Sequence, residues 1–139
     1  MAQDEELNRY MALAEYYKEQ LSQLDMQLSY LQQAINEYTK SKMTIKNISE
    51  KGKDSEVLIP IGGASYINAK VNDPKKILFD IGSGYIVEKG SEDATKKIDD
   101  RIEELEKNMK KLGEMRQQTQ NQAEEVYQKA QELYEQQNG

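Results

Sequence analysis

The chain has 139 residues, of which 37% are hydrophobic and 32% are charged, and its formal net charge at neutral pH is −6. It contains no His and no Cys, which excludes the commonest general base, a thiolate nucleophile and a disulfide framework. The chain has an excess of acidic residues and no Lys/Arg cluster, which disfavours nucleic acid and anionic membranes as partners. We expect neither a signal sequence nor a membrane span.

Residues 1–48 carry a heptad pattern, in which apolar or aromatic residues recur in alternating steps of three and four. This narrow stripe predicts one long helix whose seam is covered by a partner helix in a coiled coil. A three- or four-helix bundle also produces heptads, but little else in the chain is free to form one. The seam positions are Leu7, Tyr10, Ala14, Tyr17, Leu21, Leu24, Leu28, Leu31, Ile35 and Tyr38.

Residues 56–89 differ from the rest in being β-branched, apolar and punctuated by glycine. Strands are predicted over 57–61, 65–71, 76–81 and 85–89, and the short glycine loops between them indicate two hairpins. Pro60 cannot donate to a strand ladder, so it should lie at an edge or a bulge. A phosphate loop at Gly82-Ser83-Gly84 is disfavoured, because the third glycine of that motif is missing and a strand follows.

The predicted hairpins carry more apolar surface than one chain can bury, and their edges are unpaired. We therefore expect an assembly surface at which strands from several chains close a β-barrel, burying the faces of Ile67 and Phe79. The residues assigned to assembly are Val57, Ile59, Ile67, Val71, Ile77, Phe79, Ile81, Tyr85 and Val87.

A second long helix is predicted over residues 91–135, because Ser91 is a suitable N-cap and a heptad seam runs from Ile98 to Leu133. Arg116 interrupts that seam, and Met115 is expected to replace it through a local shift, while Gly113 should loosen the coil. The fold class is therefore α+β: an antiparallel two-helix coiled coil, in one domain, whose arms are joined by two hairpins. The exposed charged faces offer no pocket, so we expect no enzymatic activity, cofactor or metal.

The central sequence resembles the alpha-class subunit of the prefoldin family. The resemblance is carried by "EVLIPIGGASYINAKV" followed by "ILFDIGSGYIVEK", and it is most specific at Leu58–Gly62 and Asp80–Lys89. It implies a hexamer of two alpha and four beta subunits with a β-barrel body and six coiled coils. It also implies a cytoplasmic, ATP-independent chaperone that captures unfolded proteins at the coil tips and passes them to a group II chaperonin, and it favours an archaeal source.

By position, the resemblance assigns client binding to both ends of the chain. Met11 and Leu13 lie off the seam and are the better candidates, since seam residues also pack the coil. The alternative is a structural tether or filament subunit assembled through its hairpins. The client-binding residues implied are Leu7, Tyr10, Met11, Leu13, Val126, Tyr127, Leu133 and Tyr134.

Overall fold

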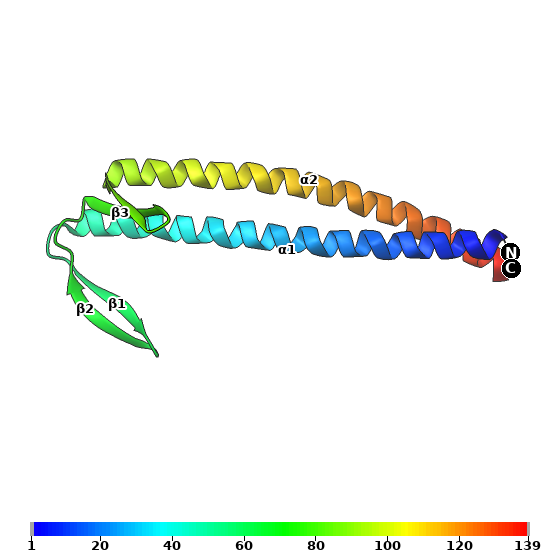
Figure 1. The fold of residues 1–139 in the computed structure, drawn as a ribbon, viewed down its shortest axis with the longest axis horizontal. Helices are drawn as coiled ribbons and strands as arrows, with labels where there is room; N and C mark the ends of the chain where they lie inside the picture. Colours follow the sequence, from blue (N-terminus) through cyan, green and yellow to red (C-terminus); the bar gives the residue numbers. More distant parts are fainter. Residues whose placement is uncertain (1, 139) are drawn as a thin grey trace. The chain divides into compact units, whose positions relative to one another are not determined.

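A computed structural model describes residues 2–138 and contains two long helices separated in sequence by two β-hairpins (Figure 1). These residues form two compact units: a terminal unit of residues 2–34 and 105–138, and a hairpin unit of residues 35–104. The α+β class predicted from the sequence is confirmed. In chain order the elements are α1 Ala2–Lys51, β1 Glu56–Gly62, β2 Ser65–Lys70, β3 Lys76–Gly82, β4 Tyr85–Gly90 and α2 Ser91–Asn138.

In the terminal unit, the first part of α1 packs antiparallel against the last part of α2. Gln137 donates a hydrogen bond to Asp4 at 2.7 Å, and Arg116 pairs with Asp25, so that later residues of α1 meet earlier residues of α2. The described residues hold two helices, which confirms the coiled coil over the bundle. Every predicted seam position is buried or half-buried, and the buried ones in this unit are Ala14, Leu24, Leu105, Ala123 and Val126.

The hairpin unit has a small hydrophobic core built from both helices. Ile45 of α1 packs with Ala94 and Ile98 of α2, and their exposed fractions are 8%, 0% and 2%. An ion pair of 2.7 Å between Lys42 and Asp99 lies beside this core. Lys42 occupies a seam position, and the ion pair gives its charge a partner there.

The helix ends in the hairpin unit follow from local sequence signals. After α1, Gly52 adopts a φ of 82° and its N–H donates to the carbonyl of Ile48 at 3.2 Å, which caps the last turn. Helix α2 begins at Ser91 directly after β4, and Thr95 donates to the Ser91 carbonyl at 2.9 Å. The acidic first turn suits the positive end of the helix dipole.

The hairpins are two separate antiparallel sheets, β1 with β2 and β3 with β4. Each closes with a two-residue loop at positive φ, Gly63-Ala64 in one and Ser83-Gly84 in the other, as type I′ turns require. The Gly82–Gly84 stretch is therefore a hairpin turn, as expected, and not a phosphate loop.

Each hairpin also has a bulge in its first strand, immediately before the turn. The pairing register shifts between Pro60 and Gly62 in β1, and between Asp80 and Gly82 in β3. Pro60 thus lies at a bulge in a two-stranded sheet, which confirms its predicted position. The two hairpins share one local design, with a bulge that increases the strand twist just before the turn.

Two expectations were wrong in detail. Val71 lies beyond β2, although its N–H donates to Ser55 and its carbonyl accepts from Asp54, which extends the pairing past the strand. The seam of α2 does not shift at Arg116: Met115 is 52% exposed, whereas Arg116 faces α1 and is half-buried. The Asp25 carboxylate on α1 gives the guanidinium a partner, so an arginine is accommodated at this position.

Candidate functional site

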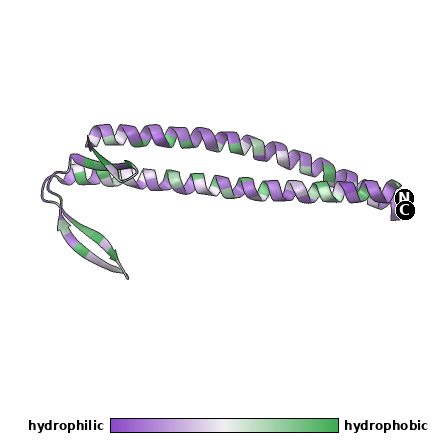
Figure 2. Ribbon diagram, viewed as in Figure 1, coloured by the Kyte–Doolittle hydropathy of each residue, from purple (hydrophilic) through white to green (hydrophobic). Residues whose placement is uncertain are grey.

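The first hairpin, β1–β2, exposes apolar residues on both faces, and Figure 2 colours both of its strands partly as hydrophobic. Leu58 and Tyr66 lie on one face and are 66% and 59% exposed. Ile59 and Ile67 face each other on the opposite side and are 49% and 53% exposed. No residue from 58 to 68 is buried. A two-stranded hairpin that is exposed on both faces has marginal stability in water, so we expect another protein surface to pack against it.

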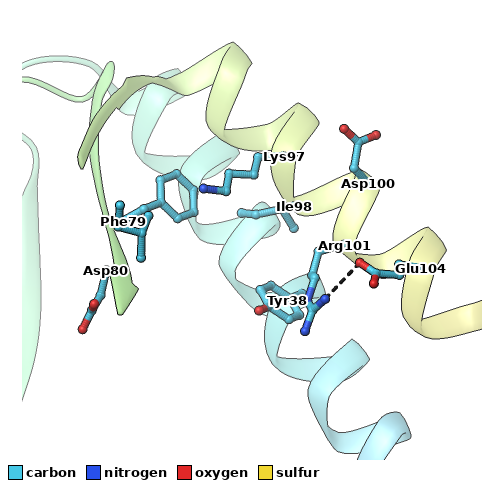
Figure 3. A pocket seen from close by; sticks show the side chains of 9 residues that line it. Tyr38, Phe79, Asp80, Lys97, Ile98, Asp100, Arg101 and Glu104 are labelled. Carbon is cyan, nitrogen blue, oxygen red and sulfur yellow. Dashed lines mark hydrogen bonds and ion pairs between the residues drawn. The ribbon is translucent and has the colours of Figure 1, made fainter. Parts of the chain in front are cut away.

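The second hairpin, β3–β4, is covered on one face by the helices of its own chain. Ile77 and Phe79 pack against the core formed by Ile45, Ala94 and Ile98. The ammonium of Lys97 lies 5.2 Å from the centre of the Phe79 ring, a cation–π contact, whereas Asp80 points away from it (Figure 3). The face of Phe79, which was expected to be buried in a barrel of strands from several chains, therefore packs in part against helices of its own chain.

The opposite face of β3–β4 is the exposed one. Leu78 and Ile86 are 64% and 63% exposed, beside an ion pair of 2.9 Å between Lys76 and Glu88. These residues were not predicted as assembly residues, although the sequence contained a signal for them: in both hairpins the second face also carries apolar residues. The exposed apolar residues that the assignment to assembly omitted are Leu58, Ile61, Tyr66, Leu78 and Ile86.

The other residues assigned to assembly divide by exposure. Ile59, Ile67, Ile81 and Tyr85 are exposed, whereas Val57, Val71 and Val87 are half-buried. Period-two alternation sorts side chains onto two faces, but it does not say whether a helix of the same chain or another subunit covers each face.

An open hollow lies between β3 and the helices of the hairpin unit (Figure 3). The Tyr38 hydroxyl accepts a hydrogen bond from Arg101, and Glu104 pairs with the same guanidinium at 2.9 Å. These two contacts, with Tyr38 the larger, raise the pKa of Arg101 above its ordinary value. Both cations that line the hollow therefore already have partners: Lys97 contacts Phe79, and Arg101 contacts Tyr38 and Glu104. We interpret the hollow as a structural feature of the hairpin unit and not as a binding site.

The second candidate surface is the part of the terminal unit formed by residues 2–19 and 119–138, called here the terminal coil end. Of the residues assigned to client binding, Met11 and Leu13 are 56% and 36% exposed, and Tyr127 and Tyr134 are 56% and 59% exposed. Leu7, Tyr10 and Leu133 are half-buried in the seam, and Val126 is buried. The off-seam residues are therefore the accessible ones, as their spacing predicted.

A shallow groove runs between the two helices at the terminal coil end. Met11 and Tyr127 line it from opposite helices, together with three alanines and one carboxylate. Lys129 lies 6.0 Å from the centre of the neighbouring Tyr10 ring. The residues lining the groove are Met11, Ala12, Ala14, Glu15, Tyr127 and Ala130.

The structure of residues 2–138 also bears on metal binding and on membrane insertion. No cluster of three or more His, Cys, Asp or Glu side chains with the geometry to hold a metal ion is present there. No helix in the same range is long and apolar enough to cross a membrane.

Comparison with known proteins identifies the class of protein. The family model described as "Prefoldin subunit" matches residues 17–136. The chain therefore belongs to the prefoldin family, whose members are chaperone subunits. This supports the interpretation as a chaperone subunit over a tether or filament subunit.

Three similar relatives within that family are named as alpha subunits. "Prefoldin subunit alpha" of Methanoculleus marisnigri is 38% identical over 109 residues, covering 78% of this chain and 72% of the relative. The protein of the same name from Archaeoglobus fulgidus is 31% identical, covering 89% and 90%. That from Methanospirillum hungatei is 34% identical, covering 94% and 82%. A chain in the structure of filamentous PFD from Methanocaldococcus jannaschii is 26% identical with a TM-score of 0.44, covering 96% of this chain and 98% of that one.

Proposed function

We propose that this chain is the alpha-class subunit of a hexamer of two alpha and four beta subunits, whose hairpins form a shared β-barrel body. The observation that carries this proposal is the apolar surface left exposed on the hairpins, above all Leu58, Ile67 and Leu78. Partner strands would pair the open edges and cover that surface. In this proposal residues 1–48 and 91–135 are arms and residues 56–89 the body of one domain.

The proposed activity is to hold unfolded proteins at the terminal coil end and to pass them to a group II chaperonin in the cytoplasm, without catalysis or cofactor. Exposed Met11, Tyr127 and Tyr134 support it, because methionine and tyrosine offer adaptable apolar contact to varied sequences. Each such contact is weak, so affinity would come from several coils acting on one client. Independence from ATP is supported by both glycine stretches being hairpin turns.

Native mass spectrometry of the chain, alone and mixed with a beta-class subunit, tests the assembly. The expected result is a hexamer of two alpha and four beta chains in the mixture. A closed homo-oligomer that excludes the beta chain would overturn the proposed partner. Suppression of aggregation of a denatured protein, measured with and without ATP, tests the activity, and suppression that required ATP would contradict it.

A further inference from the structure

The charge of the chain is concentrated at the terminal coil end. Residues 1–19 and 119–139 hold nine carboxylate side chains against three cations, a net charge of −6, which is the net charge of the whole chain. The remaining residues carry equal numbers of each sign. The nine are Asp4, Glu5, Glu6, Glu15, Glu19, Glu124, Glu125, Glu132 and Glu135, and all are exposed.

One of these carboxylates lines the groove between Met11 and Tyr127, and two others lie close to it in the helices. Glu15 lines it, and an adjoining hollow on α1 is lined by Glu15, Glu19 and one cation, Lys18. Glu124 precedes Tyr127 by three residues and so shares its side of α2. Of the three cations, Lys129 is engaged with the Tyr10 ring. An apolar groove is thus edged by negative charge.

We infer that this groove selects its clients by charge, and that its preferred occupant is an extended segment of unfolded polypeptide in which apolar side chains are flanked by Lys or Arg. The inference rests on the proposed function and specifies its client class. Apolar residues would contact Met11, Tyr127 and the alanines of the groove, while flanking cations would meet Glu15, Glu19 and Glu124. Segments flanked by Asp or Glu would be repelled at the same positions.

Charge complementarity affects both the rate at which a client segment associates with the groove and the preference for one segment over another. A field of one sign raises the association rate of an oppositely charged ligand and lowers that of a like-charged one, and salt screens both effects. The Debye length falls from about 10 Å at about 0.1 M salt to about 3 Å at about 1 M. Selection by charge should therefore fade with salt, whereas apolar contact should persist.

Three fluorescent peptides with one shared apolar centre and with Lys, Ser or Glu flanks test the inference by anisotropy. The titrations use the full chain, alone and assembled with a beta-class subunit. At about 0.1 M salt the Lys-flanked peptide should bind on the order of tenfold more tightly than the Glu-flanked one, with the Ser-flanked peptide between them. At about 1 M salt the three affinities should converge.

Two charge variants test whether the carboxylates near the groove cause the selectivity between the peptides. The triple substitution Glu15→Gln, Glu19→Gln, Glu124→Gln should narrow the difference between the Lys- and Glu-flanked peptides severalfold. The control Glu37→Gln, Glu106→Gln, Glu114→Gln removes the same charge from exposed positions elsewhere and should leave the difference intact. Circular dichroism should show unchanged helix content in both.

The outcomes separate the inference from the proposed function. Equal binding of the three peptides, or an equal loss of selectivity in both triple variants, overturns selection by charge and leaves client holding in place. Failure to bind any of the peptides, together with no suppression of aggregation, overturns the proposed function as well.

Discussion

The guanidinium of Arg116 in α2 donates from Nε to Oδ1 of Asp25 in α1 at 2.5 Å, across the seam of the coiled coil. Its Nη1 also donates to Gln120 at 3.0 Å. The hydrogen bond and the charge of Asp25 raise the pKa of Arg116 above its ordinary value. A raised pKa contributes stability that is complete below the ordinary pKa of the group and is lost only above it. Titration of Arg116 therefore costs no stability at any pH near neutrality, and salt is the appropriate probe of this pair.

Replacing Arg116 with Leu should raise the thermal midpoint of the chain and make it less sensitive to salt. Leu completes the apolar seam, whereas an exposed ion pair adds little and is screened. Circular dichroism melts at low and high salt measure both effects. The control Lys110→Leu adds the same side chain at an exposed position of α2. A lower midpoint for the Arg116 variant alone would show that the ion pair stabilises the coil more than apolar packing does.

Two glycines should respond to alanine in opposite directions. Gly113 lies within α2 at an ordinary φ with open space around its Cβ position, so Gly113→Ala should stabilise the helix by about 1 kcal/mol. Gly82 has a φ of 106°, where an L side chain is strained, so Gly82→Ala should destabilise the second hairpin by about 1–3 kcal/mol. Urea denaturation measures the first and hydrogen exchange of β3 and β4 the second. Equal and small effects at both sites would contradict the two backbone assignments.

Ile98→Ala should be the most damaging of the conservative truncations, because this side chain is 2% exposed in the core shared with Ile45 and Ala94. The cost of such a truncation is about 2–5 kcal/mol. Met115→Ala, at 52% exposure on the same helix, is the matched control and should change the unfolding free energy by less than about 0.5 kcal/mol. Urea midpoints that move equally in both variants would place the core elsewhere.

The coil was predictable from sequence because a step of three or four residues keeps a side chain on one face of a helix. Lys42 and Arg116 are charged, yet both lie at seam positions, and each forms an ion pair with a carboxylate on the opposite helix. The pairing of Arg116 with Asp25 was not predictable, because it depends on the register between α1 and α2. The prediction that Met115 replaces Arg116 in the seam was wrong. A periodicity of apolar residues cannot reveal that a charged side chain occupies a seam position when it has an ion-pair partner.

The turns were predictable because only glycine and a few other residues tolerate consecutive positive φ values. The two faces of the hairpins were not. Phe79 and Leu78 are both apolar neighbours on β3, yet one packs on Ile98 and the other is exposed. That difference depends on how the strand leaves the helices, which no local pattern records. For the residues assigned to client binding, the distinction between seam and off-seam positions did anticipate which of them are exposed.

Assembly should therefore be more cleanly disrupted at the exposed face than at Phe79. Leu58→Asp changes a side chain that is 66% exposed in the free chain, so the fold should keep its stability. In an assembled body the same carboxylate would be buried without a partner, at a cost of several kcal/mol. Sedimentation with the beta-class subunit should show loss of the hexamer while circular dichroism stays unchanged. Met43→Asp, at 59% exposure on α1, is the control, and an intact hexamer in the Leu58 variant would remove this face from the interface.

Client holding should depend on Met11 and Leu13, which project from α1 outside the seam and are 56% and 36% exposed. Replacing both with Ser removes apolar contact at the terminal coil end without opening the seam, so the melting temperature and the hexamer should be preserved. Suppression of aggregation of a denatured protein by the assembled complex should fall severalfold, because each of several coils loses part of a weak contact and the losses multiply when coils act together.

The matched control for this variant replaces Met43 and Met115 with Ser, at 59% and 52% exposure, away from the terminal coil end. It removes a similar amount of exposed apolar surface and should leave suppression unchanged. If the Met11 and Leu13 variant protected the client as well as the parent complex at equal concentration, these two residues would not form the capture surface. Equal weakening by both variants would instead indicate that clients bind along the helices generally, because exposed apolar side chains would then be interchangeable wherever they lie.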